Sequence, residues 1–224
     1  MPFYLTKIPT IIQRILKNYI WSFPFSKNDQ KTIYLTFDDG PTEGITEWTL
    51  NELKKYNAKA TFFCIGKNIE NHPRIYQRIV NEGHSIGNHT HNHLNGWKCS
   101  NANYLKNIEL ADKAIQKFNK SNLKTINSEQ LFRPPYGKIK PLQAIKLREN
   151  GYKIIMWDVL SVDFDQKITV EKCLKNVIEN TKNGSIVVFH DSIKASENLK
   201  YSLPKVLDYF RNKGYVFKRI AQQG

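Results

Sequence analysis

Cysteine is scarce in this sequence, and long apolar runs are absent. The three cysteines are Cys64, Cys99 and Cys173, and an odd number at such wide spacing excludes a disulfide framework and a Cys-x-x-Cys metal site. No stretch reaches the ~18 consecutive apolar residues of a membrane-spanning helix. The N-terminus also lacks the small-x-small cleavage site of a secretory signal peptide. We therefore expect one globular domain, whose 224 residues bury enough apolar surface to fold without covalent links.

Acidic residues are few relative to basic ones. The 34 lysines and arginines outnumber the 20 aspartates and glutamates, which gives a formal net charge of +14 and favours an anionic partner. Nucleic acid is a poor candidate, because no helix-turn-helix, zinc finger or RNP-type segment is present. Only seven of the basic residues are arginine, the side chain preferred for bidentate phosphate contacts. We predict no nucleic-acid partner and interpret the charge as a lysine-rich surface that favours an anionic cell envelope.

Residues 1–29 are predicted to form an amphipathic helical extension of a domain that covers residues 30–224. Apolar side chains recur at helical spacing across residues 8–23, with Arg14 and Lys17 on the polar side of the pattern. Such a helix packs against the domain or lies on a membrane surface. Both interpretations stay open at this point, so residues 8–23 are a candidate for peripheral membrane contact. A monomer is the favoured oligomeric state.

Strand and helix patterns alternate along the rest of the chain, which indicates parallel βα units. Strands are expected at residues 31–38, 59–65, 84–87, 130–133, 152–158, 185–190 and 215–220, and helices at 44–56, 68–82, 101–119, 140–150, 169–182 and 199–213. Five of these strands are followed by polar side chains, namely Asp38, His89, Arg133, Asp158, Asp163 and His190. A (β/α) barrel brings residues from many strand ends to one face, whereas an open sheet collects them at one switch point. We therefore predict a distorted (β/α)7-type barrel with an N-terminal helical extension.

Two adjacent carboxylates, Asp38 and Asp39, follow the first of these strands. Like charges side by side raise each other's pKa, so the pair is costly unless a cation binds one of them. A metal that takes one carboxylate leaves the other available as a general base. The alternative is an ordinary turn, because Asp-Asp-Gly-Pro over residues 38–41 is favourable turn chemistry.

Three of the six histidines fall within residues 89–93. His89 and His93 are four residues apart, a spacing that puts both imidazoles on one face of a helical turn and lets them share an ion. Together with one aspartate they form a three-ligand set that leaves positions open for water and substrate, as in a catalytic site. Zn²⁺, or a similar first-row ion such as Co²⁺, is the expected occupant, because two imidazoles disfavour Ca²⁺. A solvated polar loop is the alternative.

Three further segments place polar or aromatic side chains at strand ends. Arg133 precedes two prolines and Tyr136, a rigid stretch that fixes the positions of the guanidinium and of the Tyr136 backbone N–H. Residues 157–164 combine aromatics with carboxylates, as in sugar-binding surfaces. His190 ends an apolar strand that includes Val188, on the face where the other strand-end residues are expected. Taken singly, each segment is also compatible with an ordinary loop or with core packing.

In their order and spacing, these five segments resemble the motifs of the NodB-homology polysaccharide deacetylases, carbohydrate esterase family 4, from about residue 30 to the C-terminus. The resemblance implies a distorted (β/α) barrel and a metal-dependent hydrolase. Its expected reaction removes N-acetyl groups from N-acetylglucosamine-containing glycans such as peptidoglycan, chitin oligomers or an exopolysaccharide. It also implies roles for individual residues: Asp39, His89 and His93 as metal ligands, Asp38 as general base, Arg133 as the residue that orients it, the Tyr136 backbone N–H as oxyanion donor, His190 as general acid, and Asp163 as the charge partner of His190.

Two positions depart from the family pattern. Phe164 stands where the family usually has tryptophan, and Val188 stands where it usually has leucine. Both keep an apolar wall, so we expect Phe164, Val188, Trp157 and Tyr136 to line the substrate site. An O-acetyl esterase acting on acetylated polysaccharide would use the same site and is the alternative function. A catalytically silent glycan-binding module on the same fold is a third interpretation, which the intact acid, base and ligands argue against.

Overall fold

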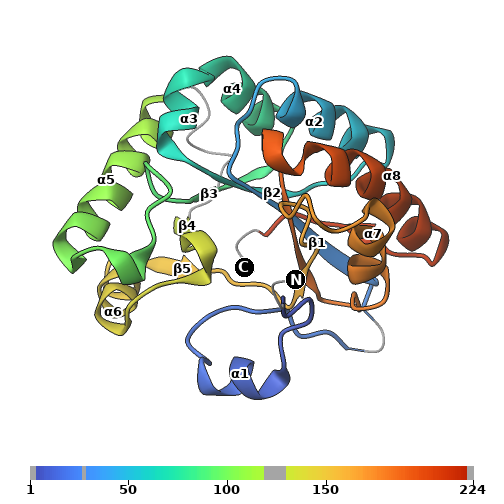
Figure 1. Ribbon diagram of the computed structural model, residues 1–224, viewed down its shortest axis with the longest axis horizontal. Coiled ribbons are helices and arrows are strands. Elements are labelled where there is room, and N and C mark those ends of the chain that lie inside the picture. The colour runs from blue at the N-terminus through green and yellow to red at the C-terminus, as the bar shows by residue number, and fades with distance from the viewer. Residues whose placement is uncertain (1–3, 27–28, 119–129, 221–224) are drawn as a thin grey trace.

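The computed structural model describes residues 4–26, 29–118 and 130–220, which form one curled sheet inside a ring of helices (Figure 1). The strands are β1 (Thr32–Asp38), β2 (Thr61–Cys64), β3 (Ser85–Asn88), β4 (Gln130–Phe132), β5 (Tyr152–Ile154), β6 (Val159–Leu160), β7 (Ile186–His190) and β8 (Val216–Phe217). Their order is β5-β4-β3-β2-β1-β7-β6, with β8 beside β1, and the paired strands are parallel. The path ends at β5 and β6, so the barrel is interrupted there. The predicted distorted (β/α) barrel is confirmed.

The helices lie outside the sheet (Figure 1). They are α1 (Thr10–Ile15), α2 (Ile45–Lys55), α3 (Gly66–Asn71), α4 (Pro73–Asn81), α5 (Asn101–Phe118), α6 (Pro141–Glu149), α7 (Val170–Ile178) and α8 (Ser196–Asn212), with 3-10 turns η1 (Gly96–Lys98), η2 (Pro135–Gly137) and η3 (Ile193–Ala195). The helix predicted at 68–82 is two helices, because Pro73 begins α4 and has no N–H to continue the preceding turn. The strand predicted at 152–158 is shorter in the structure, where β5 ends at Ile154. The next strand, β6, begins only at Val159 and lies at the opposite end of the sheet.

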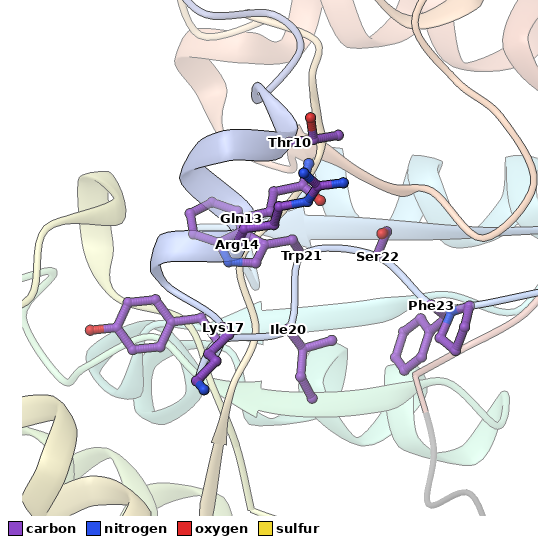
Figure 2. A pocket seen from close by; sticks show the side chains of 10 residues that line it. Thr10, Gln13, Arg14, Lys17, Ile20, Trp21, Ser22 and Phe23 are labelled. Carbon is purple, nitrogen blue, oxygen red and sulfur yellow. The ribbon is translucent and has the colours of Figure 1, made fainter.

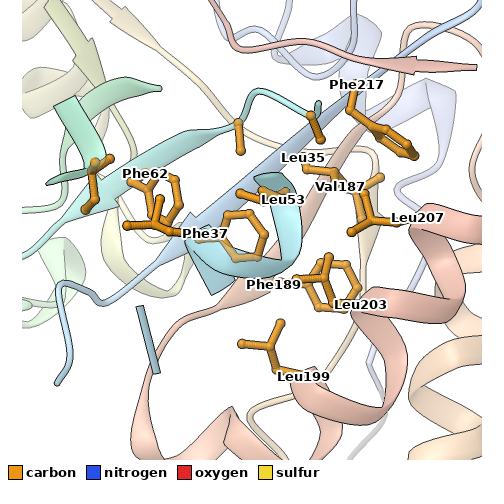
Figure 3. Packing of buried hydrophobic residues seen from close by; sticks show 14 of the residues in the cluster. Leu35, Phe37, Leu53, Phe62, Val187, Phe189, Leu199, Leu203, Leu207 and Phe217 are labelled. Carbon is orange, nitrogen blue, oxygen red and sulfur yellow. The ribbon is translucent and has the colours of Figure 1, made fainter. Parts of the chain in front are cut away.

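The larger hydrophobic core lies between the central strands and helices α2 and α8 (Figure 3). Phe37 of β1 stacks on Phe62 of β2 and on Phe189 of β7, with ring centroids 5.0 Å and 6.2 Å apart. Helix α8 covers these rings with a row of leucines at four-residue spacing, Leu199, Leu203 and Leu207. Side chains alternate across a strand, so Thr36 and Asp38 of β1 point the opposite way, into the barrel. This alternation is what places polar groups on the inner face.

The N-terminal segment fills the interruption between β5 and β6. Lys7 forms an antiparallel bridge with Val159 of β6, and Ile20 forms a parallel bridge with Ile155, directly after β5. The Lys7 ammonium lies 2.6 Å from a carboxylate oxygen of Asp158. Figure 1 shows α1 in the ring of helices, between α6 and α7. The segment is therefore part of the barrel wall.

The helix predicted across residues 8–23 is much shorter in the structure, where α1 covers only Thr10–Ile15. Residues 20–23 are extended, because the Ile20 N–H donates to the carbonyl of residue 154 and the Phe23 N–H donates to the carbonyl of residue 184. These partners are distant in sequence, so periodicity alone does not reveal them. The boundary between residues 29 and 30 stays a prediction. Within the described ranges, no helix is both long enough and apolar enough to cross a membrane.

Candidate active site

The functional side chains gather at the carboxyl ends of the parallel strands, inside the barrel. Asp38 ends β1 and His190 ends β7, and the two residues are direct register partners. His89 follows β3, Arg133 follows β4, and Asp163 lies three residues beyond β6. Because parallel strands end at the same edge of a sheet, these residues meet although up to 152 positions separate them in sequence (190 − 38).

Asp158 is the one strand-end carboxylate that does not join this group. Strand β5 ends at Ile154, and the chain then runs toward the start of β7. There Asp158 Oδ1 accepts a hydrogen bond from the Ile186 N–H at 2.9 Å. Its Oδ2 accepts from the Ser185 hydroxyl at 2.9 Å and from Lys7 at 2.6 Å. Asp158 is therefore a buried structural carboxylate that ties the N-terminal segment to β7.

Arg133 is fully buried and orients Asp38. Its Nη1 donates to Oδ1 of Asp38 and to Oγ1 of Thr36, both at 2.7 Å. Its Nε and Nη2 donate to the backbone carbonyls of Ile155 and Met156 at 3.1 and 2.9 Å. Four bonds from a planar guanidinium leave little rotational freedom, so one carboxylate oxygen of Asp38 is held in place.

Asp39, His89 and His93 form a candidate metal site, with one possible ligand atom from each lying within 4.8 Å of the others. Asp39 Oδ1 lies 3.2 Å from His93 Nε2 and 3.7 Å from His89 Nε2. This oxygen is buried and has no hydrogen-bond partner of good geometry in the described part of the chain. The Nδ1 atoms are engaged elsewhere, 2.8 Å from the Arg133 carbonyl for His89 and 3.1 Å from the Tyr136 hydroxyl for His93. The donor set fits a metal, because these contacts leave both Nε2 atoms directed at Asp39.

The charge states of the ligands suit a cation. Burial by itself would raise the pKa of Asp39, but the approach of His93 and the neighbouring imidazoles hold it well below its usual range. Burial lowers the pKa of His89 to about 4, against the opposing pull of Asp38. Near neutral pH, Asp39 is therefore an anion and His89 a neutral imidazole, the forms in which these groups coordinate metals.

The two histidines converge, but not on the helical turn that their spacing predicted. Residues 89–95 form a loop, with φ of 63° at Thr90 and 54° at His93. Asn107 on α5 holds this loop, because its Oδ1 accepts two successive backbone N–H groups, from residues 91 and 92, at 2.9 and 3.0 Å. Sequence reasoning missed Asn107, because the amide side chain of a single helix residue does not by itself indicate such a contact. Its position on the buried side of an amphipathic helix was the only available hint.

His190 and Asp163 form a buried pair beside Asp38. Nδ1 of His190 lies 2.7 Å from Oδ1 of Asp163, and the His190 backbone N–H donates to Oδ2 at 2.7 Å. Burial would lower the pKa of His190, but the charge and hydrogen bond of Asp163 raise it to about 9. His190 is therefore protonated near neutral pH, which is the state required of a general acid.

Aromatic rings line the rim of the site. Phe164 packs edge-on against His190 with ring centroids 5.0 Å apart, and Tyr4 of the N-terminal segment packs edge-on behind Phe164 at 5.5 Å. Tyr136 is 61% exposed and lies against His93, with ring centroids 4.6 Å apart. Tyr136 also has a φ of 61°, which turns its backbone sharply after two prolines. Phe164 and Tyr136 are thus in place to contact a substrate, and that contact stays a prediction.

Trp157 and Val188 lie deeper than these rings. Val188 is only 1% exposed and sits two residues before His190 on the same strand face. Trp157 packs 5.8 Å from the Arg133 guanidinium, and its buried indole N–H has no hydrogen-bond partner in the described ranges. Their direct contact with substrate likewise stays a prediction.

A cleft of about 460 Å³ opens beside the candidate metal site. Its walls include Asp39, Ile65, Asn68, His93, Ile193 and Lys194. The volume falls within the range typical of small-ligand and sugar sites. One glycan residue can therefore approach Asp39 and His93 from this side.

Asp191 is a second residue that sequence reasoning missed, although it directly follows His190. It is fully buried, where it accepts hydrogen bonds from the Gly40 N–H at 3.1 Å and from the Thr46 hydroxyl. A Cβ on Gly40 would lie 2.1 Å from its carboxylate, so only glycine fits there. Burial raises the pKa of Asp191 to about 7. Asp191 thus supports the turn that presents Asp38 and Asp39, and its place in the last motif was the available signal.

Comparison with known proteins agrees with this geometry. Residues 25–155 match the family model described as polysaccharide deacetylase. The chain is 34% identical over 203 residues to a peptidoglycan-N-acetylglucosamine deacetylase of Bacillus cereus, covering 90% of this chain and 91% of that protein. It is 35% identical over 178 residues to chitin deacetylase 2 of Saccharomyces cerevisiae, covering 77% of this chain and 54% of that protein.

A solved structure gives the same result in three dimensions. The Bc1960 peptidoglycan N-acetylglucosamine deacetylase superposes with a TM-score of 0.83 and 31% identity, over 93% of this chain and 94% of that one. The resemblance predicted from the five motifs is therefore confirmed. Together with the match of residues 25–155, these relatives show that the chain belongs to the polysaccharide deacetylase family.

Proposed function

We propose that this protein is a metal-dependent hydrolase that removes N-acetyl groups from N-acetylglucosamine residues of a cell-envelope glycan. One observation carries the proposal: a ligand set of Asp39, His89 and His93 stands beside two groups of opposite proton affinity. Asp38 is an arginine-bound carboxylate that suits a base, and His190 is a protonated imidazole that suits an acid. An amide hydrolase needs these three components together.

Asp39, His89 and His93 would hold the divalent ion that the family implies. We propose Zn²⁺, with Co²⁺ as the nearest substitute, because a mixed imidazole and carboxylate set with open positions is typical of catalytic zinc. When bound, such an ion polarises the acetyl carbonyl and makes water more acidic.

The side chains supply the proton transfers. Asp38 accepts a proton from the attacking water, while Arg133 keeps its carboxylate oriented. The Tyr136 N–H donates to the oxyanion that develops on the former carbonyl oxygen, a contact worth about 3–4 kcal/mol in comparable sites. His190 then gives its proton to the nitrogen as the C–N bond breaks, so a neutral amine leaves. Asp163 stabilises the imidazolium until that transfer.

Peptidoglycan is the proposed substrate, with chitin oligomers and a poly-N-acetylglucosamine exopolysaccharide as the other glycans to compare. The relatives named for peptidoglycan and chitin favour N-acetylglucosamine as the common sugar. Phe164 and Tyr136 offer the ring faces and edges on which pyranose rings stack. We further propose that the enzyme works as a monomer at the cell envelope, in peripheral contact with a membrane surface through residues 8–23.

The test is acetate release from these three glycans and from O-acetylated xylan, with and without a chelator. We expect release from an N-acetylated glycan, a loss of at least about 100-fold on chelation, and recovery with Zn²⁺. Undiminished release after chelation would contradict the metal assignment. Release from xylan alone would instead identify an O-acetyl esterase, and glycan binding without release would identify a silent binding module.

Asp163→Asn is expected to shift the alkaline limb of the pH–rate profile downward. The folded enzyme holds the pKa of His190 at about 9, so the acid is present below that pH and is lost as pH rises through it. Without the Asp163 charge, only the weaker attraction of Asp39 and Asp38 opposes the burial that lowers this pKa. We expect a limb at lower pH and at least a tenfold loss at neutral pH, measured as kcat/KM against pH.

Ser161→Ala is the matched control, because Ser161 also bonds Asp163 Oδ1, at 2.9 Å, but carries no charge. Its limb should stay near that of the unmodified enzyme. An unchanged limb in Asp163→Asn would show that Asp163 does not set the pKa of His190.

A further inference from the structure

Helix α1 carries apolar side chains on two faces, and only one of them packs against the barrel. Ile8 and Ile12 lie against the cluster that contains Trp21. On the outer face, Ile11 is 60% exposed and Ile15 is 71% exposed. Isolated exposed apolar residues are ordinary, but here five of the eleven large exposed ones in the described ranges fall within residues 5–25: Leu5, Ile11, Ile15, Leu16 and Phe25.

Cations accompany this apolar surface and acids do not. Residues 1–28 contain no aspartate or glutamate. Arg14 and Lys17 are exposed beside Ile15, and neither takes part in a salt bridge within the described part of the chain. Lys7 differs, because Asp158 already neutralises it. The exposed surface of α1 and of the turn after it therefore combines apolar side chains with two positive charges that no acidic side chain neutralises.

A cavity of about 570 Å³ lies next to this face, between α1 and residues 19–24 (Figure 2). Gln13 and Arg14 line it from α1, Lys17 lines it from the turn after α1, and Trp21 and Phe23 line it from the following segment. Cations above an aromatic and apolar floor are the surroundings that suit a phosphodiester headgroup at the membrane interface. Its volume is sufficient for such a group.

We propose that the exposed surface of α1 and of the two residues that follow it (Ile11, Arg14, Ile15, Leu16 and Lys17) docks on an anionic phospholipid surface. A second copy of the chain is a poorer occupant, because a two-fold contact would bring Arg14 and Lys17 against their own copies with no acid nearby. An anionic bilayer instead pairs these cations and removes the isoleucines from water. Docking here leaves the catalytic cleft open, since none of the five residues lines it.

The structure narrows the membrane contact from residues 8–23 to this one face. Ile8 and Ile12 are packed inward. The backbone of residues 20–23 is bonded into the barrel wall, so these residues line the cavity but do not lie on the docking face. The inference rests on surface groups alone and is independent of the proposed deacetylase activity.

Vesicle sedimentation with the full chain tests the proposal. We expect binding to phosphatidylglycerol vesicles, little binding to phosphatidylcholine vesicles, and weakening by salt, since the attraction is partly electrostatic. The Arg14→Glu, Lys17→Glu double variant should bind phosphatidylglycerol at least about tenfold more weakly. Ile11→Asn, Ile15→Asn should lose a similar factor without unfolding, because both side chains are already exposed.

Helix α5 offers matched controls on another part of the ring. Lys106→Glu, Lys113→Glu changes the net charge equally, and Leu110→Asn removes an exposed apolar side chain. These controls should bind like the unmodified protein. Acetate release from a soluble glycan, if present, should be the same in all variants. The proposal would be overturned if the protein did not bind anionic vesicles, or if the α5 variants weakened binding equally. It would also be overturned if Ile11→Asn, Ile15→Asn abolished a dimer and left lipid binding unchanged.

Discussion

Asp38→Asn is expected to reduce acetate release by about 10²- to 10⁴-fold, the contribution of a positioned general base. An amide oxygen in place of the carboxylate still accepts the hydrogen bond from Arg133, which lies 2.7 Å from Asp38 Oδ1, so the fold should persist. What disappears is a group that can take a proton from water. The measurement is initial-rate acetate release, together with the metal content of the purified variant.

Metal content separates this role from that of the neighbouring carboxylate. Asp38→Asn leaves Asp39, His89 and His93 in place, so bound metal should equal that of the unmodified enzyme. Asp39→Asn should lose both metal and activity, because Asp39 is the anionic member of the ligand set. Near-normal turnover in Asp38→Asn would assign the base to another group.

The barrel and most of its site could be predicted from the sequence, because both depend on strand order and little else. Once strands and helices alternate, every strand ends at the same edge, so Asp38, His89, Arg133 and His190 must approach one another. Their chemical types then restrict the function, since acids and imidazoles at one edge suit a metal hydrolase. No side-chain detail is needed for that step.

Details that depend on distant partners could not be predicted. The pattern of residues 8–23 is helical, but the helix ends at Ile15, and hydrogen bonds to the barrel hold residues 20–23 in an extended conformation. Asp158 follows a strand pattern, yet the chain turns back there and Ile186 binds its carboxylate. The His89 loop is shaped by Asn107 on α5. In each case, tertiary hydrogen bonds decide a conformation that local spacing assigns differently.

The same distinction applies to electrostatics. The family resemblance implies His190 as a general acid and Asp163 as its charge partner. The 2.7 Å contact between them in the structure explains why His190 keeps its proton near neutral pH although burial lowers its pKa. Asp191, directly after His190, looks in the sequence like a further carboxylate of the active site. Its contacts with Gly40 and Thr46 give it a structural role instead.

Arg133→Met is expected to destabilise the fold by about 3–5 kcal/mol, the usual cost of leaving a buried charge without its partner. The variant fills similar volume but removes four hydrogen bonds, and it leaves Asp38 charged in a site that is only 3% exposed. For a chain of this length, each kcal/mol corresponds to ~2–4 °C in Tm, so a fall of roughly 6–20 °C is expected. Thermal and urea unfolding measure the change.

Two controls determine whether the orphaned charge is the cause. Adding Asp38→Asn to Arg133→Met removes that charge, so the double variant should be more stable than the sum of the two single losses implies. Arg78→Met breaks a partly exposed ion pair with Glu82, at 2.6 Å, and should cost no more than about 1 kcal/mol. If Arg133→Met costs as little as Arg78→Met, the buried guanidinium is not a principal support of the fold. Strictly additive losses in the double variant would show that Asp38 and Arg133 stabilise the protein independently.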